Sequence, residues 1–255
     1  MVSKREILSF YKETSKWRYR SKVEKWENLT PIFNFLKLQA DDRLLDIGCG
    51  TGIFIQKCRK ICQSFGVDPY PVRKSPYIFR AFAENLPFKN DSFSVVYLSK
   101  TFFLIDKKIV LKEIKKALKP NGRLFIRELL YSRMWDEIIN QVRSIVLRRK
   151  IPIDKNDKKI EKIIIQSLKK NGFKIKNIFK FQTRLIYPSQ KLLIERFLYY
   201  SPLINLKKHT HPRIIKETIE QVVKRIYNKS RTTLYNNLLI EAIKNYDKTI
   251  AQAPH

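Results

Sequence analysis

Short apolar runs alternate with amphipathic stretches through the first half of the chain. Residues spaced three and four apart mark helices between these runs, and short loops connect the two kinds of segment. Such an alternation is typical of a parallel sheet that is covered by helices on both faces. The pattern predicts strands over 43–47, 64–67, 94–98 and 123–126, helices over 51–62 and 107–118, and a turn at 119–122.

The pattern changes in the second half of the chain, where amphipathic stretches dominate. Residues 173–184 alternate with lysines on one side, which is typical of a strand at the edge of a sheet. Residues 238–243 are expected to form a last strand. The pattern further predicts helices around 135–146, 158–170 and 190–230, in addition to two helices within 3–37.

The composition supports a folded protein, since 44% of its 255 residues are hydrophobic and 12% are aromatic. No run approaches the 18 or so apolar residues of a membrane-spanning helix, and the first residues lack the apolar segment of a secretory signal. Three cysteines form no disulfide framework, so a cytoplasmic location is expected.

The formal net charge of +30 has two explanations that the sequence leaves open. Codon usage in an AT-rich genome enriches lysine without any functional cause. A polyanionic partner, either a nucleic acid or an anionic membrane surface, would select the same excess. The excess of basic residues covers both residues 44–150 and residues 151–255, and it forms no separate basic tail. Basic residues that follow the expected strands 94–98 and 123–126 are Lys100, Lys107, Lys108, Arg127, Arg133, Arg148, Arg149 and Lys150.

The segment Leu44–Gly52 combines a buried strand with a glycine-rich turn that leads into a helix. Glycines permit a positive φ and the close approach of a ligand to the backbone, and amides at a helix start favour an anionic group. The G-x-G-x-G spacing of Gly48, Gly50 and Gly52 differs from the G-x-G-x-x-G of dinucleotide-binding proteins. The alternative is a tight turn of purely structural importance.

Three further segments follow in a characteristic order. Asp68 ends the next strand about 20 residues after Gly48, where an acid can accept hydrogen bonds from ribose hydroxyls. A turn or capping role before Pro69 is the alternative. The other two segments are Ala83-Glu84-Asn85-Leu86-Pro87-Phe88 with Asn90–Val96, and Leu118–Leu124.

Together the four segments resemble the class I S-adenosylmethionine-dependent methyltransferases, most closely the type 11 domain family of quinone and small-molecule methylases. The resemblance is close over residues 40–130. It implies a Rossmann-like α/β fold, with a mostly parallel seven-stranded sheet, helices on both faces, and helical N-terminal and C-terminal lid elements. It divides the chain into an N-terminal helical segment (1–37), a cofactor-binding methyltransferase core (38–130), and a helical cover with the last strands completing the same domain (131–255).

The resemblance also implies S-adenosylmethionine as the cofactor. Asp46 and the glycine turn would hold its methionine end, and Asp68 would hold the ribose. Ala83 and Glu84 would line the adenine, and Ser99 would lie near the methyl-donor sulfur. The expected cofactor-binding residues are Asp46, Gly48, Cys49, Gly50, Gly52, Asp68, Pro69, Ala83, Glu84 and Ser99.

Some positions depart from the family pattern. Ala81 and Phe82 replace a Gly-Asp pair whose Asp meets the adenine amino group, so Glu84 or the backbone must serve. This departure leaves a non-enzymatic binding module as one rival. An NAD-dependent oxidoreductase is the other, although the glycine spacing disfavours it. No metal site is expected, because Cys58 and Cys62 lack a second pair of ligands.

The acceptor and any catalytic base stay open at the level of sequence. Glu128, Tyr131 and Tyr187 are conceivable bases, and nothing in the sequence selects one of them. Apolar and aromatic residues in the expected cover favour a small-molecule or lipid-like acceptor. The alternative is a tRNA or rRNA acceptor, which the positive charge would suit.

Overall fold

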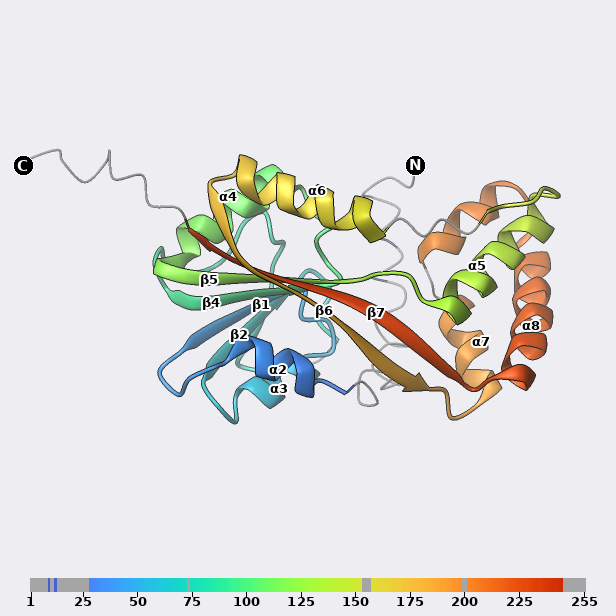
Figure 1. Ribbon diagram of the computed structural model, residues 1–255, viewed down its shortest axis with the longest axis horizontal. Helices are drawn as coiled ribbons and strands as arrows, with labels where there is room; N and C mark the ends of the chain where they lie inside the picture. The colour runs from blue at the N-terminus through green and yellow to red at the C-terminus, as the bar shows by residue number, and fades with distance from the viewer. Residues whose placement is uncertain are drawn as a thin grey trace, which may run out of the picture. The chain divides into compact units, whose positions relative to one another are not determined.

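The structure is a computed structural model that describes residues 9, 12, 28–72, 74–152, 157–198 and 201–244 (Figure 1). The first of the two helices expected within residues 3–37 lies outside these ranges except for Ser9 and Lys12. The described residues form two compact units. The sheet unit comprises the described residues within 30–128, 158–180 and 238–244, and the helical unit comprises those within 129–157 and 181–237.

One seven-stranded sheet carries the fold, and its order is β3-β2-β1-β4-β5-β7-β6. The sheet is mostly parallel and β7 runs antiparallel, so the expected Rossmann-like fold class is confirmed. The edge position expected for residues 173–184 is also confirmed, because they belong to β6. The strands are β1 (Arg43–Ile47), β2 (Gln63–Asp68), β3 (Ile78–Arg80), β4 (Phe93–Ser99), β5 (Leu118–Leu129), β6 (Phe173–Ile186) and β7 (Thr232–Lys244).

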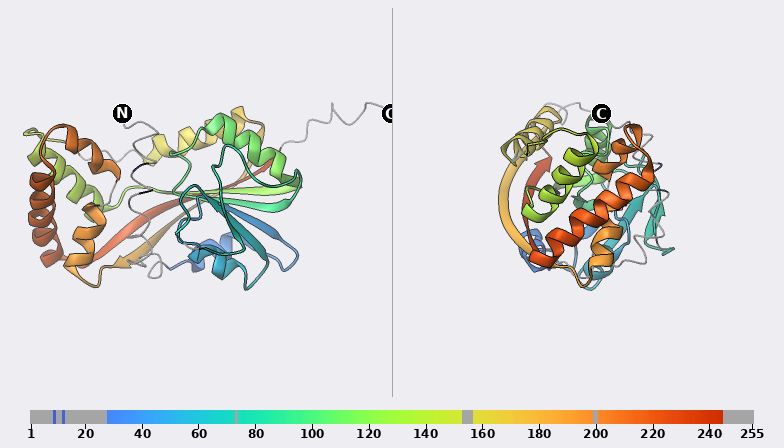
Figure 2. Two further views of the ribbon diagram at one scale, coloured as in Figure 1. Left: turned by 180° about the vertical axis from the view of Figure 1, so that it is seen from behind. Right: turned by 90° about the vertical axis from the view of Figure 1, so that its right-hand side faces the viewer.

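Helices of the sheet unit cover both faces of its sheet. Helices α2 (Thr30–Leu36) and α3 (Ile53–Cys58) lie on one face, while α4 (Lys107–Ala117) and α6 (Asp157–Lys170) lie on the other, as Figures 1 and 2 show. The sequence of α4 explains its place. Asp106 caps its start by accepting a hydrogen bond from the Ile109 amide, and its apolar residues at helical spacing are buried.

The helical unit has a hydrophobic core of its own. Helix α8 (Pro212–Lys229) packs against α5 (Arg133–Val146) and α7 (Gln190–Leu198), and buried residues such as Trp135 and Val223 fill the space between them (Figure 2). The stretch 190–230 was expected to be helical, and it is divided by the 3₁₀ helix η2 (Ser201–Lys208). A new helix starts at Pro212, since proline is well suited to the first helical position. That these helices cover the sheet stays a prediction.

Three details differ from the sequence-based expectation. The helix expected over 51–62 is shorter, because Gly52 is in a left-handed conformation and α3 starts only after it. Strand β3 was not foreseen, since three residues are too short to show an alternation. The expected turn at 119–122 lies inside β5, where Leu118 already pairs with Phe93 and the next pair is Val95 with Arg123. The turn is thus a bulge in a strand that starts earlier.

No helix among the described residues is both long enough and apolar enough to cross a membrane.

Candidate cofactor site

The glycine turn lies where the strand order of the sheet reverses. Strands β1 and β4 are neighbours, but the chain proceeds from β1 to β2 on one side and from β4 to β5 on the other. In open α/β sheets, ligands bind outside the carboxyl ends of the strands at such a point. The turn 48–52 follows β1 directly, and residues 100–102 follow β4.

The backbone of the turn is held in place by the chain itself. Gly48, Gly50 and Gly52 all have left-handed φ values, of +78°, +51° and +72°. The amides of Gly48 and Cys49 both donate to the carbonyl oxygen of Val67, at 2.8 and 3.1 Å. These bonds tie the turn to the end of β2.

Packing gives Gly48 and Gly52 a second reason to be glycine. A Cβ atom at Gly48 would collide with the side chain of Thr101, and one at Gly52 would collide with Ile78. No local pattern in the sequence indicates either contact, because Thr101 and Ile78 lie far along the chain. The two glycines therefore fit the turn whether or not a ligand is bound.

Two carboxylates lie at the ends of adjacent strands beside this turn. Asp46 in β1 is 4% exposed and Asp68 at the end of β2 is 7% exposed. The Oδ2 atom of Asp68 accepts a hydrogen bond from the Gly50 amide at 2.9 Å, and Oδ1 accepts one from the Tyr70 amide at 2.8 Å. Asp68 thus organises the turn, and each oxygen retains a further lone pair for a ligand.

The remaining expected residues are distributed around the same edge. Ser99 ends β4 and is half-buried, and its carbonyl accepts a hydrogen bond from Thr101 Oγ1. Cys49 is buried, and its side chain packs so closely against Gly66 of β2 that no Cβ fits there. The carbonyl of Pro69 accepts a hydrogen bond from Arg80.

The segment expected to line an adenine follows β3. Its link to Asp68 is a hydrogen bond from the Ala81 amide to the Asp68 carbonyl, at 3.3 Å. Ala83 is buried, and Glu84 accepts a hydrogen bond from the Asp106 amide at 3.2 Å. Phe82 is 45% exposed, so an aromatic face stands where the resemblance implies an aspartate.

Glu128 is the acid that the structure singles out among the conceivable bases. It lies at the carboxyl end of β5 and is 8% exposed, and its Oε1 accepts a hydrogen bond from the Phe102 amide at 3.1 Å. Burial raises the pKa of Glu128 to about 7, although the Phe102 amide and three nearby cations favour the carboxylate. The cations are Lys100, Arg127 and Lys107.

The hydroxyl of Tyr187 is already engaged in the helical unit. It accepts a hydrogen bond from Trp135 Nε1 at 2.7 Å and lies 2.9 Å from the hydroxyl of Tyr235. Tyr187 has no exposed surface. A hydroxyl with two buried partners is suited to a structural role.

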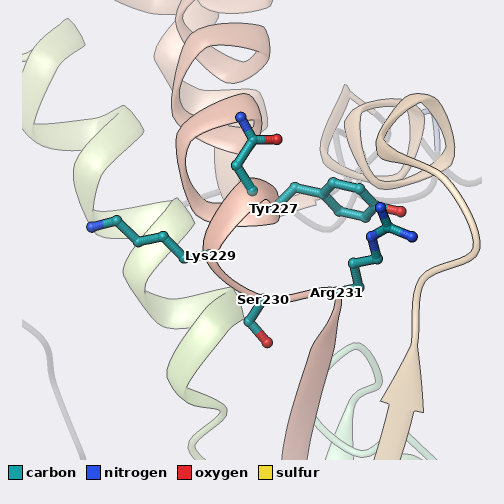
Figure 3. A pocket seen from close by; sticks show the side chains of 5 residues that line it. Tyr227, Lys229, Ser230 and Arg231 are labelled. Atoms are coloured by element: carbon teal, nitrogen blue, oxygen red, sulfur yellow. The ribbon is translucent and has the colours of Figure 1, made fainter.

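A polar hollow of about 330 Å³ lies at the end of α8 (Figure 3). Its lining is the continuous stretch 227–231, which contains no carboxylate. The guanidinium of Arg231 lies 5.6 Å from the ring centroid of Tyr227. Nothing in this lining resembles the set of groups around the glycine turn.

Residues 17–176 match the model of a family described as a methyltransferase domain. This match spans more than half of the chain, and the chain belongs to that family. The protein is thus an S-adenosylmethionine-dependent methyltransferase, and the two rival classes are set aside. Membership of the type 11 subfamily stays a prediction. No curated protein sequence matches the chain.

Solved structures share the fold at low sequence identity. The BH2331 protein of Bacillus halodurans is 14% identical, with a TM-score of 0.54 over 86% of this chain and 99% of its own. The [4+2]-cyclase SpnF is 16% identical, with a TM-score of 0.55 over 95% of this chain and 96% of its own. The phosphoethanolamine N-methyltransferase 2 of Haemonchus contortus is 18% identical, with a TM-score of 0.51 over 96% of this chain and 61% of its own.

Proposed function

We propose that the protein binds S-adenosylmethionine at the carboxyl ends of β1, β2 and β4 and transfers its methyl group to a small-molecule or lipid-like acceptor. One observation carries the site: Asp68 clamps the turn that contains Gly50, with Asp46 on the adjacent strand. Carboxylates suit the ammonium and ribose hydroxyls of this cofactor, and the closely approachable turn suits its methionine end.

Individual roles follow from these positions. Asp46 and the backbone of Gly48, Cys49, Gly50 and Gly52 would hold the methionine end. Asp68 and Pro69 would hold the ribose, while Ala83 and Glu84 would line the adenine. Ser99 would lie beside the methyl donor.

Methyl transfer from this cofactor mainly requires the protein to position the two reactants. When bound, the sulfonium cofactor supplies a methyl group that is already activated. The chain then has to align the acceptor behind that methyl and exclude water. Orientation of this kind can lower a barrier by roughly 7–11 kcal/mol.

Exposed aromatic side chains near the site support a small or lipid-like acceptor. Phe82 and Phe103 are 45% and 40% exposed, and they follow β3 and β4 respectively. Binding sites for small molecules are lined predominantly by apolar and aromatic groups. Phe82 comes directly before Ala83 of the expected adenine segment, and Phe103 follows Ser99 by four positions.

An RNA acceptor is the second candidate, favoured by the net charge of +30. The lysines of β6 are far from the glycine turn. Lys174, Lys176 and Lys180 are exposed on β6, which lies four strands from β1. At about 4.8 Å per strand, that separation is roughly 19 Å. Lysines at this distance do not line the proposed methyl-donor site, so the small acceptor is preferred.

Calorimetry with S-adenosylhomocysteine tests the site through Gly50→Val. A branched side chain at a φ of +51° strains the turn and occupies the approach to the backbone, so we expect binding to be lost while the fold is retained. Gly172→Val is the matched control, because Gly172 has a similar φ of +73° in the turn between α6 and β6. Undiminished affinity in a folded Gly50→Val protein would contradict the placement.

A further inference from the structure

Glu128 lies near the carboxyl end of β5, at the edge of the sheet where β1 and β4 also end. We propose that its carboxylate accepts the proton that a hydroxyl or amine acceptor gives up as it is methylated. The inference rests on the proposed function and deepens it, because it assigns a base to the reaction and an O–H or N–H group to the acceptor.

The strand register places Glu128 beside the site. Ser99 at the end of β4 pairs with Arg127 of β5, and the Lys100 amide donates to the Arg127 carbonyl at 2.8 Å. Glu128 is the next residue along β5. Since β4 also pairs with β1, the ends of the three strands lie in the order β1, β4, β5 along one edge.

One short connection joins Glu128 to the glycine turn. Residues 100–102 leave β4, and within them Thr101 packs against Gly48 so closely that no Cβ fits there. The amide of the next residue, Phe102, donates to Glu128 Oε1 at 3.1 Å. The carboxyl group is thereby held by Phe102, the residue next to the one that packs against the turn.

The second oxygen of this carboxyl group remains for the reaction. Among the described residues, Oε1 takes the hydrogen bond from Phe102 and Oε2 takes none. A carboxylate oxygen in this position can accept a hydrogen bond from the O–H or N–H group of the acceptor before the methyl transfer. It would orient the acceptor as well as deprotonate it.

The charges around Glu128 suit a base at neutral pH. Lys100 precedes the connection, Arg127 precedes Glu128 itself, and Lys107 starts α4 with its ammonium 5.5 Å from the Phe102 ring centroid. These cations favour the carboxylate while burial favours the acid, and the balance leaves the pKa at about 7. A general base is most effective when its pKa is near the operating pH.

The proposed step balances in atoms and electrons. A lone pair of the acceptor oxygen or nitrogen forms the new bond to the methyl carbon. The bond between carbon and sulfur breaks, and its electron pair stays on the sulfur, which becomes a neutral thioether. The proton of the acceptor passes to Oε2 of Glu128 and from there to solvent.

Sinefungin provides a test that needs no knowledge of the acceptor. This analogue carries an amine where S-adenosylmethionine carries the transferable methyl, so its ammonium probes for a carboxylate at that point. Calorimetry at pH 6 and pH 8 gives its affinity relative to that of S-adenosylhomocysteine. For a carboxyl that titrates near pH 7, the ionised fraction rises about tenfold over this range, and we expect the relative affinity to rise with it.

Glu128→Gln should abolish this pH dependence and keep the affinity for S-adenosylhomocysteine. The amide oxygen of Gln can still accept a hydrogen bond from the Phe102 amide, so residues 100–102 should stay in place. Binding of S-adenosylhomocysteine then verifies that the variant is folded. Glu113→Gln, which changes an exposed ion pair with Lys116 on α4, is the control and should behave like the unmodified protein.

Two results would overturn the inference. If S-adenosylhomocysteine binds but the relative affinity of sinefungin is flat with pH, or is the same in Glu128→Gln, then Glu128 is only a structural ligand of the connection. If S-adenosylhomocysteine does not bind the unmodified protein, the proposed cofactor site itself fails, and the inference fails with it.

Discussion

At the scale of single residues, Asp68 holds the glycine turn through both of its carboxylate oxygens. A ribose-binding acid and a turn aspartate were alternatives, and the hydrogen bonds to Gly50 and Tyr70 establish the turn role. The same carboxylate is close to the proposed ligand because it holds the turn. The two roles are therefore compatible, and a binding measurement has to show whether Asp68 also holds the ribose.

Asp68→Ala should weaken S-adenosylhomocysteine binding by about 1–3 kcal/mol, the typical effect of removing a buried acceptor opposite donors. Calorimetry on the purified variant measures it. Asp91→Ala is the control, since Asp91 is an exposed residue just before the start of β4, at the opposite end from the site. Normal binding in Asp68→Ala would reduce Asp68 to a turn residue.

The raised pKa of Glu128 has a consequence for stability. The unfolded chain ionises this carboxyl near its ordinary pKa of 4.5, whereas the folded protein does so only at about 7. The native state therefore binds more protons between these values, and the group costs stability as pH rises through this window. Above pH 7 the cost is about 3 kcal/mol at about 1.4 kcal/mol per pH unit.

Glu128→Gln should remove that cost while keeping an oxygen for the Phe102 amide. We expect the variant to be more stable than the unmodified protein at pH 8, by up to about 3 kcal/mol. The difference between the two proteins should shrink toward pH 5. Urea unfolding at both pH values measures it, and a difference that is independent of pH would contradict the assigned titration.

At the scale of elements, the helical unit depends on a polar network inside its core. The Tyr187 hydroxyl, at the start of the segment after β6, links the Trp135 indole of α5 to the Tyr235 hydroxyl of β7. Amphipathic spacing predicted α5 and the stretch that contains α8. It could not predict this network, because its members are about 50 residues apart in sequence.

Tyr187→Phe should destabilise the helical unit by about 1–3 kcal/mol, because two buried partners lose their hydrogen bond. Urea unfolding followed by circular dichroism provides the measurement. Tyr77→Phe is the control, since Tyr77 is 36% exposed and its change should stay within about 0.5 kcal/mol. Equal stability of both variants would show that the network contributes nothing.

At the scale of the whole molecule, the charge calls for a direct test with RNA. For a small acceptor we expect RNA binding that is micromolar or weaker and independent of sequence. Fluorescence anisotropy across a salt series measures it, since each neutralised phosphate of a single strand contributes about −0.7 to the log–log slope. Tight binding with a steep slope, abolished by Arg148→Glu with Arg149→Glu, would favour the RNA acceptor instead.

Local patterns in the sequence were sufficient to predict the fold class and the methyltransferase family. Strand and helix periodicity depends on neighbours within a few residues, and the glycine turn, Asp68 and the two later segments are read directly from their order along the chain. Local propensity and spacing carry that information directly. The edge position of β6 was predictable for the same reason, because its exposed lysines lie within one strand.

Tertiary structure alone decided which side chains meet at the site. Thr101 against Gly48, Asp68 holding Gly50 and Phe102 holding Glu128 join residues that are 53, 18 and 26 positions apart. Such contacts arise from strand order and register, and no local pattern encodes them. Burial in the fold then sets the pKa of Glu128, and it distinguishes this acid from the other candidates that the sequence left equal.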